Sequence, residues 1–191
     1  NIANNHIDLK AKAGIGINNQ NSDRHQQILD NTVYLSNNSA DPIIASDVYA
    51  CFGIVNMNAK KTSIKANYMY GSPSLQGFNS RNRIGLLMSY SPNNILECNK
   101  VKYSRYGFYA WGDNTTSSGN IKYNKFNANA YPWYFLDFGS ASPATYGNVG
   151  NGMTDNGNEM ISIANPINWL NTGGLNPGLF KVFRNSTSQP N

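Results

Sequence analysis

Apolar and polar residues alternate in short runs along this chain, and turn-forming residues separate the runs. One six-residue pattern recurs five times: an apolar residue, an asparagine three positions later, and a second apolar residue two positions after that. The copies are Ile2-Asn5-Ile7, Ile28-Asn31-Val33, Ile64-Asn67-Met69, Leu96-Asn99-Val101 and Ile121-Asn124-Phe126. Alternation with a period of two predicts short β-strands, and recurrence every 25 to 36 residues predicts a stack of similar coils.

A second kind of apolar run follows each copy and opens with Gly or Pro. These runs are Gly14–Ile17, Gly53–Val55, Gly85–Met88, Gly107–Ala110 and Pro132–Phe135. The two longer coils contain Ser39–Ala50 and Gly71–Asn82, whose loop-forming composition predicts insertions. Helices are not predicted, since no stretch longer than ten residues keeps a helical period free of Gly, Pro or Asn clusters.

The pattern predicts an all-β solenoid of about five to seven coils in a single domain. Residues 1–138 hold the regular coils. Residues 139–191 are expected to form a loop, a last irregular coil and a C-terminal cap, because the open end of a solenoid exposes sheet edges. The length of 191 residues, with 40% hydrophobic content, fits one compact domain.

Asparagine makes up 32 of the 191 residues, and the repeat gives it a structural purpose. Asparagine tolerates positive φ better than other non-glycine residues, so we expect the five repeated asparagines to occupy sharp corners in that conformation. In stacked coils their side-chain amides would lie above one another and form a hydrogen-bonded ladder.

The asparagine corner followed by Gly-apolar-x-apolar resembles the coil of right-handed parallel β-helix proteins of the pectate-lyase-like superfamily. The resemblance covers roughly residues 1–138. It implies that the asparagine lies between the second and third strands of a coil and that the glycine run is the first strand of the next. That superfamily includes lyases, glycosidases, phage tailspikes and adhesins, so the resemblance implies a fold rather than one function.

Strand alternation predicts which side chains of the glycine runs face outward. The inward set is expected to be Ile15, Ile54, Leu86, Phe108 and Trp133 or Phe135. The outward set is expected to be Gly16, Val55, Leu87, Tyr109 and Tyr134, extended by Trp111 and Leu136. In enzymes of the resembled superfamily this sheet carries clustered carboxylates, whereas the outward residues here are apolar or aromatic.

Two interpretations of this sheet stay open. Tyr109, Trp111 and Tyr134 form a candidate carbohydrate-binding strip, because flat amphipathic rings suit sugar faces; alternatively, the C-terminal segment covers it. For catalysis, the candidates are Asp113 and Asp137 as paired carboxylates and Arg105 as a lyase base. We interpret both aspartates as turn and loop residues instead.

The net charge of +5 comes from scarce acids and not from a dense basic stripe, so no nucleic-acid partner is expected. An acidic polysaccharide would suit this charge. The basic clusters, expected to be solvated, are Lys60-Lys61, Arg81/Arg83 and Lys100/Lys102/Arg105. No membrane insertion is expected, because no apolar run reaches 18 residues.

The remaining candidate chemistry predicts neither a metal site nor a cofactor. His6 and His25, the only histidines, are expected at the surface, and a two-histidine site would lack neighbouring acids except Asp8 and Asp23. Cys51 and Cys98 are expected to be free thiols.

Three function classes follow from the sequence. The first is a non-catalytic extracellular domain of a secreted or surface protein, serving adhesion or carbohydrate recognition. The second is a polysaccharide lyase or glycoside hydrolase, or its C-terminal part. The third is a phage tailspike segment, in which outward apolar residues would meet sister chains. The first class is our prediction, on the strength of the scarce acids and the apolar outward sheet.

Overall fold

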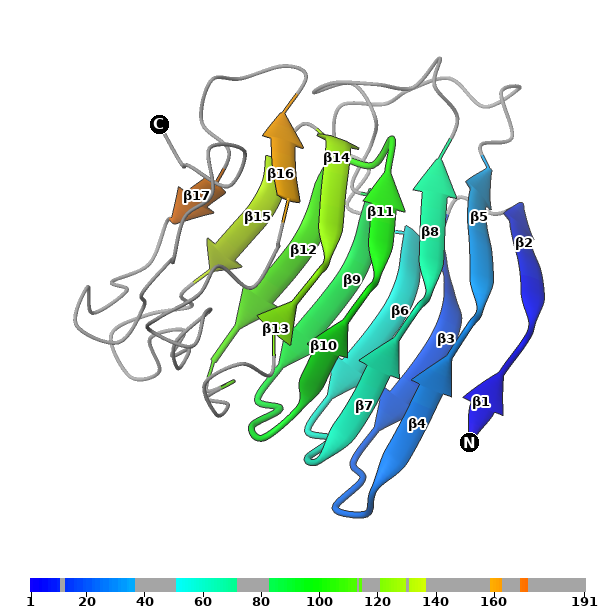
Figure 1. Ribbon diagram of the computed structural model, residues 1–191, viewed down its shortest axis with the longest axis vertical. Helices are drawn as coiled ribbons and strands as arrows, with labels where there is room; N and C mark the ends of the chain where they lie inside the picture. The colour runs from blue at the N-terminus through cyan, green and yellow to red at the C-terminus, as the bar shows by residue number, and fades with distance from the viewer. Residues whose placement is uncertain are drawn as a thin grey trace.

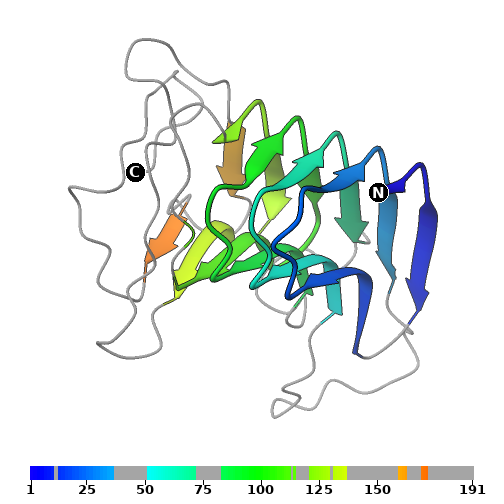
Figure 2. The same ribbon diagram turned by 90° about the horizontal axis from the view of Figure 1, so that it is seen from below.

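The computed structural model is a right-handed parallel β-helix (Figures 1 and 2). It describes residues 1–10, 13–36, 51–71, 83–112, 114, 121–129, 131–136, 159–162 and 169–171. Every strand pair in these ranges is parallel, and each sheet orders its strands by their order along the chain. The predicted all-β solenoid is therefore confirmed.

Three sheets run along the helix axis, and each of the first five coils contributes one strand to each sheet. Sheet A contains β1 (Ile2–Ala3), β4 (Gln26–Leu29), β7 (Thr62–Lys65), β10 (Ile95–Glu97) and β13 (Ile121–Lys122). Sheet B contains β2 (His6–Lys10), β5 (Thr32–Ser36), β8 (Tyr68–Gly71), β11 (Lys100–Lys102), β14 (Lys125–Asn129) and β16 (Glu159–Ser162). Sheet C contains β3 (Gly14–Gln20), β6 (Cys51–Met57), β9 (Arg83–Ser89), β12 (Tyr106–Trp111), β15 (Tyr131–Leu136) and β17 (Trp169–Asn171).

Successive coils step along the axis in chain order from the N-terminal β1 (Figure 1). Sheets B and C each reach six strands, within the predicted five to seven coils. The predicted C-terminal cap and nearly all of the two predicted insertions lie outside the described residues; Gly71 is the last residue of β8.

Apolar positions of the six-residue repeat and of the glycine runs build the core between the three sheets. Sheet A contributes Ile28, Ile64, Leu96 and Ile121; sheet B contributes Val33, Met69, Val101 and Phe126; sheet C contributes Ile17, Ile54, Leu86 and Phe108. None of these side chains is more than 3% exposed. Each stacks on its counterpart in the next coil, so both sequence patterns send apolar side chains into one continuous core.

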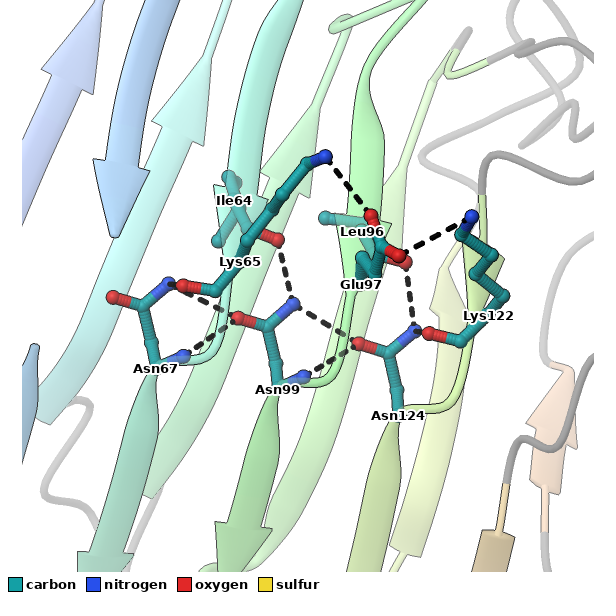
Figure 3. A network of polar contacts seen from close by, with 8 residues as sticks. All are labelled: Ile64, Lys65, Asn67, Leu96, Glu97, Asn99, Lys122 and Asn124. Carbon is teal, nitrogen blue, oxygen red and sulfur yellow. Dashed lines mark hydrogen bonds and ion pairs between the residues drawn. The ribbon is translucent and has the colours of Figure 1, made fainter. Parts of the chain in front are cut away.

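The predicted asparagine ladder stands at the corner between sheets A and B. In Figure 3 the side chains of Asn67, Asn99 and Asn124 follow one another from coil to coil. The Oδ1 atom of Asn99 accepts from both the backbone N–H (3.2 Å) and the Nδ2 (3.0 Å) of Asn67. The same pair of bonds joins Asn5 to Asn31, Asn31 to Asn67 and Asn99 to Asn124.

The prediction that these asparagines themselves adopt positive φ was wrong. The left-handed residue is the one directly before each ladder asparagine, with φ between 53° and 58°. These residues are Asn4, Asp30, Ala66, Cys98 and Tyr123. Two residues therefore build each corner. The residue before the asparagine makes the sharp turn, and the asparagine forms hydrogen bonds with the backbone groups that the turn leaves buried.

The predicted facing of the first glycine run was also wrong. Ile15 is 39% exposed and pairs with Phe52, whereas Ile17 pairs with Ile54 in the core. Gly16 faces the interior and not the solvent, because a Cβ atom there would lie 2.7 Å from the Val33 Cγ1 atom. Both changes follow from a local break in the alternation at the glycine.

The same break recurs in the next coil. A Cβ at Gly53 would lie 2.5 Å from the Gly85 carbonyl oxygen and 2.6 Å from the Met69 Cγ atom. Consecutive coils therefore approach so closely at this position that only glycine fits.

Candidate functional site

The outer face of sheet C carries a second apolar cluster, separate from the core. Val55, Ile84 and Leu87 form its centre, and Phe52, Met57, Tyr106 and Tyr109 pack around them. This confirms the apolar character that the sequence predicted for Val55 and Leu87. The three central side chains are, however, only 2% to 5% exposed. They serve as packing surface, and a ligand cannot reach them.

The backbone places the three residues of the predicted carbohydrate-binding strip in neighbouring strands. Tyr109 of β12 is in register with Tyr134 of β15, and Trp111 is in register with Leu136. Tyr109 is half-buried, and its ring meets Tyr106 edge-on at 5.3 Å. For Trp111 and Tyr134 the structure describes the backbone and not the side chains, so the strip stays a prediction.

The catalytic candidates are only partly described. Asp113 and Asp137 lie outside the described residues. Arg105 is half-buried just before β12, where its guanidinium lies 5.3 Å from the Tyr106 ring centroid. The six described strands of sheet C contain no Asp or Glu. Arg83, expected to be solvated, is only 3% exposed, because it continues the inward row that begins with Gly14 and Cys51.

The outer face of sheet B has a different chemistry. Two rows of side chains run along the helix axis, one starting at His6 and the other at Asp8. The first row continues through Thr32, Tyr68, Lys100 and Lys125, and the second through Tyr34, Tyr70 and Lys102. We call Tyr34, Tyr68, Tyr70, Lys100 and Lys102 the tyrosine–lysine face. It occupies β5, β8 and β11, which lie side by side in Figure 1.

The tyrosine rings of this face contact one another. The Tyr70 ring centroid lies 4.8 Å from that of Tyr34 on the neighbouring strand and 4.8 Å from that of Tyr68 on its own strand. The Lys100 ammonium covers the Tyr68 ring at 5.3 Å. Partial burial raises the pKa of the Tyr68 hydroxyl, and the neighbouring Tyr103 and Tyr70 raise it further. The hydroxyl therefore stays a proton donor at neutral pH.

No acid with a described side chain balances the charges of the tyrosine–lysine face. Within the described ranges, no ion pair involves Lys100 or Lys102. Three of the described acids pair elsewhere: Asp8 with Lys10, Asp23 with Lys60, and Glu97 with both Lys65 and Lys122. The last of these networks lies beside the asparagine ladder (Figure 3).

A small open hollow of about 320 Å³ lies at the corner where sheet C leads into sheet A. It is lined by Asn21, Asp23, Asn58, Lys60 and Tyr90. Its one ion pair joins Lys60 to Asp23 at 3.5 Å, and both side chains are more than half exposed. The hollow is therefore polar and open to solvent, and it does not enclose a ligand.

The remaining sequence expectations can be checked on the described part of the chain. His6 and His25 are exposed, and no group of three metal-ligating side chains occurs among the described residues. Both cysteines are thiols outside any disulfide, Cys51 buried and Cys98 exposed. The described ranges include no helix with the length and apolar character needed to cross a bilayer.

Comparisons of the chain with protein-family models, with curated proteins and with solved structures gave no match. The geometry of the site therefore carries the functional argument alone.

The sequence analysis missed the tyrosine–lysine face, although a signal for it exists. Its residues follow the ladder asparagines at fixed offsets of one and three positions. Tyr68 and Lys100 stand one position after Asn67 and Asn99; Tyr34, Tyr70 and Lys102 stand three positions after Asn31, Asn67 and Asn99. Aligning the chain on the ladder would have revealed both rows.

Proposed function

We propose that this chain is a non-catalytic carbohydrate-recognition domain of a secreted or cell-surface protein, built on a β-helix of the pectate-lyase-like superfamily. A polysaccharide would lie along the helix axis and contact equivalent positions of consecutive coils. Adhesion to a glycan-bearing surface would follow from such binding.

The observation that supports this proposal is the tyrosine–lysine face. It presents tyrosines and lysines in two rows parallel to the axis, on consecutive strands spaced about 4.8 Å apart. A repetitive ligand can therefore make the same contact in each coil. Tyrosine combines an amphipathic ring with a hydroxyl donor, which suits recognition of sugar hydroxyl and acid groups.

The non-catalytic part of the proposal rests on the distribution of acids. A glycosidase needs two carboxylates about 5 to 10 Å apart. In sheets A and B, the acids whose side chains are described are Glu97 and Asp8, and both are bound in ion pairs; the described strands of sheet C contain no acid.

The test is a glycan panel, neutral and acidic, titrated against the wild-type chain and two variants by NMR. Tyr70→Ala removes the central ring of the tyrosine–lysine face, and Tyr123→Ala removes a ring that is 53% exposed at the corner between sheets A and B. We expect at least one glycan to bind, Tyr70→Ala to weaken it, and Tyr123→Ala to leave it unchanged.

If Tyr70→Ala does not weaken binding, Tyr109→Ala tests the other candidate site. Loss of binding in Tyr109→Ala alone would move the site to the strip predicted on sheet C. Absence of binding to every glycan would refute the carbohydrate proposal, and release of new reducing ends during incubation would refute its non-catalytic part.

A further inference from the structure

We infer that the tyrosine–lysine face selects a polyanionic glycan, whose carboxylate or sulfate groups lie over Lys100 and Lys102 and accept hydrogen bonds from the tyrosine hydroxyls. This inference rests on the proposed function and adds the chemical class of the ligand.

The packing of the rings decides how this face can recognise a ligand. Tyr70 contacts both Tyr34 and Tyr68 at 4.8 Å, and the ammonium of Lys100 covers Tyr68. Tyr68 and Tyr70 therefore each have two such neighbours, and Tyr34 has one, Tyr70. These contacts occupy ring faces, so Tyr68 and Tyr70 present their edges and hydroxyl groups to a ligand. The edge of an aromatic ring carries the positive part of its quadrupole, and the hydroxyl is a hydrogen-bond donor, so both favour an anion over the apolar face of a sugar.

The surrounding charge points to the same ligand class. By the alternation of the strands, the outward positions of β5, β8 and β11 are three tyrosines, two lysines, Thr32 and Ser36, without one acid. In the preceding coil Asp8 is already paired with Lys10 at 3.1 Å. Lys100 and Lys102 have no acidic partner among the described residues, so an anionic chain meets complementary charge without displacing an existing ion pair.

A nucleic acid is also a polyanion, but this face suits it less. Single-stranded nucleic acids are held by bases that stack on the open faces of aromatic side chains. Here Tyr68 and Tyr70 use their ring faces on neighbours within the protein. Arginine, the residue that best combines stacking with phosphate binding, is absent from the described outward positions of β5, β8 and β11.

The inference is tested with ligands that share one backbone and differ in charge. Neutral dextran, carboxymethyl-dextran and dextran sulfate are titrated by isothermal calorimetry, with single-stranded poly(dT) as the nucleic-acid arm. We expect both charged dextrans to bind, with neutral dextran and poly(dT) at least tenfold weaker than carboxymethyl-dextran.

Two double variants distinguish an effect of this face on affinity from an effect of the net charge of the chain. Lys100→Ala/Lys102→Ala should weaken carboxymethyl-dextran binding about fivefold, equivalent to about 1 kcal/mol for two surface ion pairs. Lys60→Ala/Lys61→Ala removes the same charge at another corner and should change the affinity less than twofold. Circular dichroism confirms the fold of both.

A third variant, Tyr34→Phe/Tyr70→Phe, keeps both rings and removes only their hydroxyls. Weaker binding of carboxymethyl-dextran by this variant is expected if the hydroxyls donate to the anion. Unchanged binding would overturn that part of the inference.

Equal weakening by the two lysine doubles, or poly(dT) binding as tight as that of the charged dextrans, would overturn the inference. So would a glycan panel in which Tyr70 is needed for neutral sugars and charge has no effect, although the proposed function would then stand. No glycan binding at all would refute both.

Discussion

Replacing one asparagine in the middle of the ladder should cost far more stability than replacing the same residue at its end. In Asn67→Leu the side chain keeps a similar shape but can neither donate nor accept hydrogen bonds. Asn67 is 1% exposed, so water cannot take over these bonds. In Asn5→Leu the same change is made at an exposed position of the first coil.

The magnitude follows from the bonds that are lost. The Asn67 Nδ2 group donates to Asn99 Oδ1 (3.0 Å), to the Ile28 carbonyl (2.8 Å) and to the Lys65 carbonyl (2.9 Å). Its Oδ1 accepts from the Asn31 backbone N–H (3.0 Å) and from Asn31 Nδ2 (2.9 Å). With a net value of about 1 kcal/mol for each bond, and some hydrogens shared, the loss is about 3 to 5 kcal/mol. Asn5→Leu should lose less than about 1 kcal/mol, because its lost bonds are part-buried or exposed.

Urea unfolding followed by circular dichroism measures both free energies of unfolding. The reasoning predicts a difference of at least about 2 kcal/mol between the two variants. If Asn67→Leu and Asn5→Leu were equally stable within the error of the measurement, the ladder would not be what holds this corner together.

Three further outcomes are expected. Gly53→Ala should destabilise the fold by more than about 2 kcal/mol, because its Cβ would lie 2.5 Å from the Gly85 carbonyl oxygen. Gly14→Ala is the control and should cost little, because its Cβ would meet only the flexible Leu9 side chain, at 3.0 Å. Urea midpoints of the two variants test the contrast. The hydrogen bond from Lys65 is the largest of the influences that hold the pKa of Glu97 below its ordinary 4.5; burial opposes it, and Lys122 lowers the pKa further. The contribution of Glu97 to stability is therefore present above pH 4.5 and lost as the pH falls through the lowered pKa. Glu97→Gln should be less stable than wild type at pH 7 and equal to it in acid, and a constant difference across pH would contradict the ion pairs. A thiol reagent should label Cys98 in the native state and Cys51 only on unfolding, because Cys51 is buried and burial raises the pKa of its thiol; equal rates for both would contradict their placement.

The sequence was sufficient to predict the fold because one residue type at each repeat position does one physical task. Asn31, Asn67 and Asn99 form the ladder, and the apolar residues on either side of each form the core. The left-handed residue at the same corner could not be predicted, because it varies from Asp30 to Ala66 and so leaves no pattern. Several residue types can be forced into that conformation at moderate cost, whereas only an amide can make the ladder bonds.

The candidate site was harder to predict, for reasons that lie in its geometry. The aromatic residues of residues 103–138 are dense in sequence and drew attention to sheet C, where the neighbouring outward residues Val55 and Leu87 are buried. Tyr34 and Tyr70 are 36 residues apart and become neighbours only through strand pairing. The facing of Ile15 was wrongly predicted for a similar reason. Gly14 and Gly16 both offered a start for the apolar run, and only the close approach of Gly16 to Gly53 decides between them.

The central claim is that the outer face of sheet B recognises a glycan, and amide chemical-shift mapping tests it most directly. An isotope-labelled wild-type chain is titrated with a short carboxymethyl-dextran while the backbone amides are observed. The account predicts shifts concentrated in β5, β8 and β11, with those of β4, β7 and β10 in sheet A unchanged. Shifts confined to β12 and β15 of sheet C, or spread evenly over all three sheets, would contradict it.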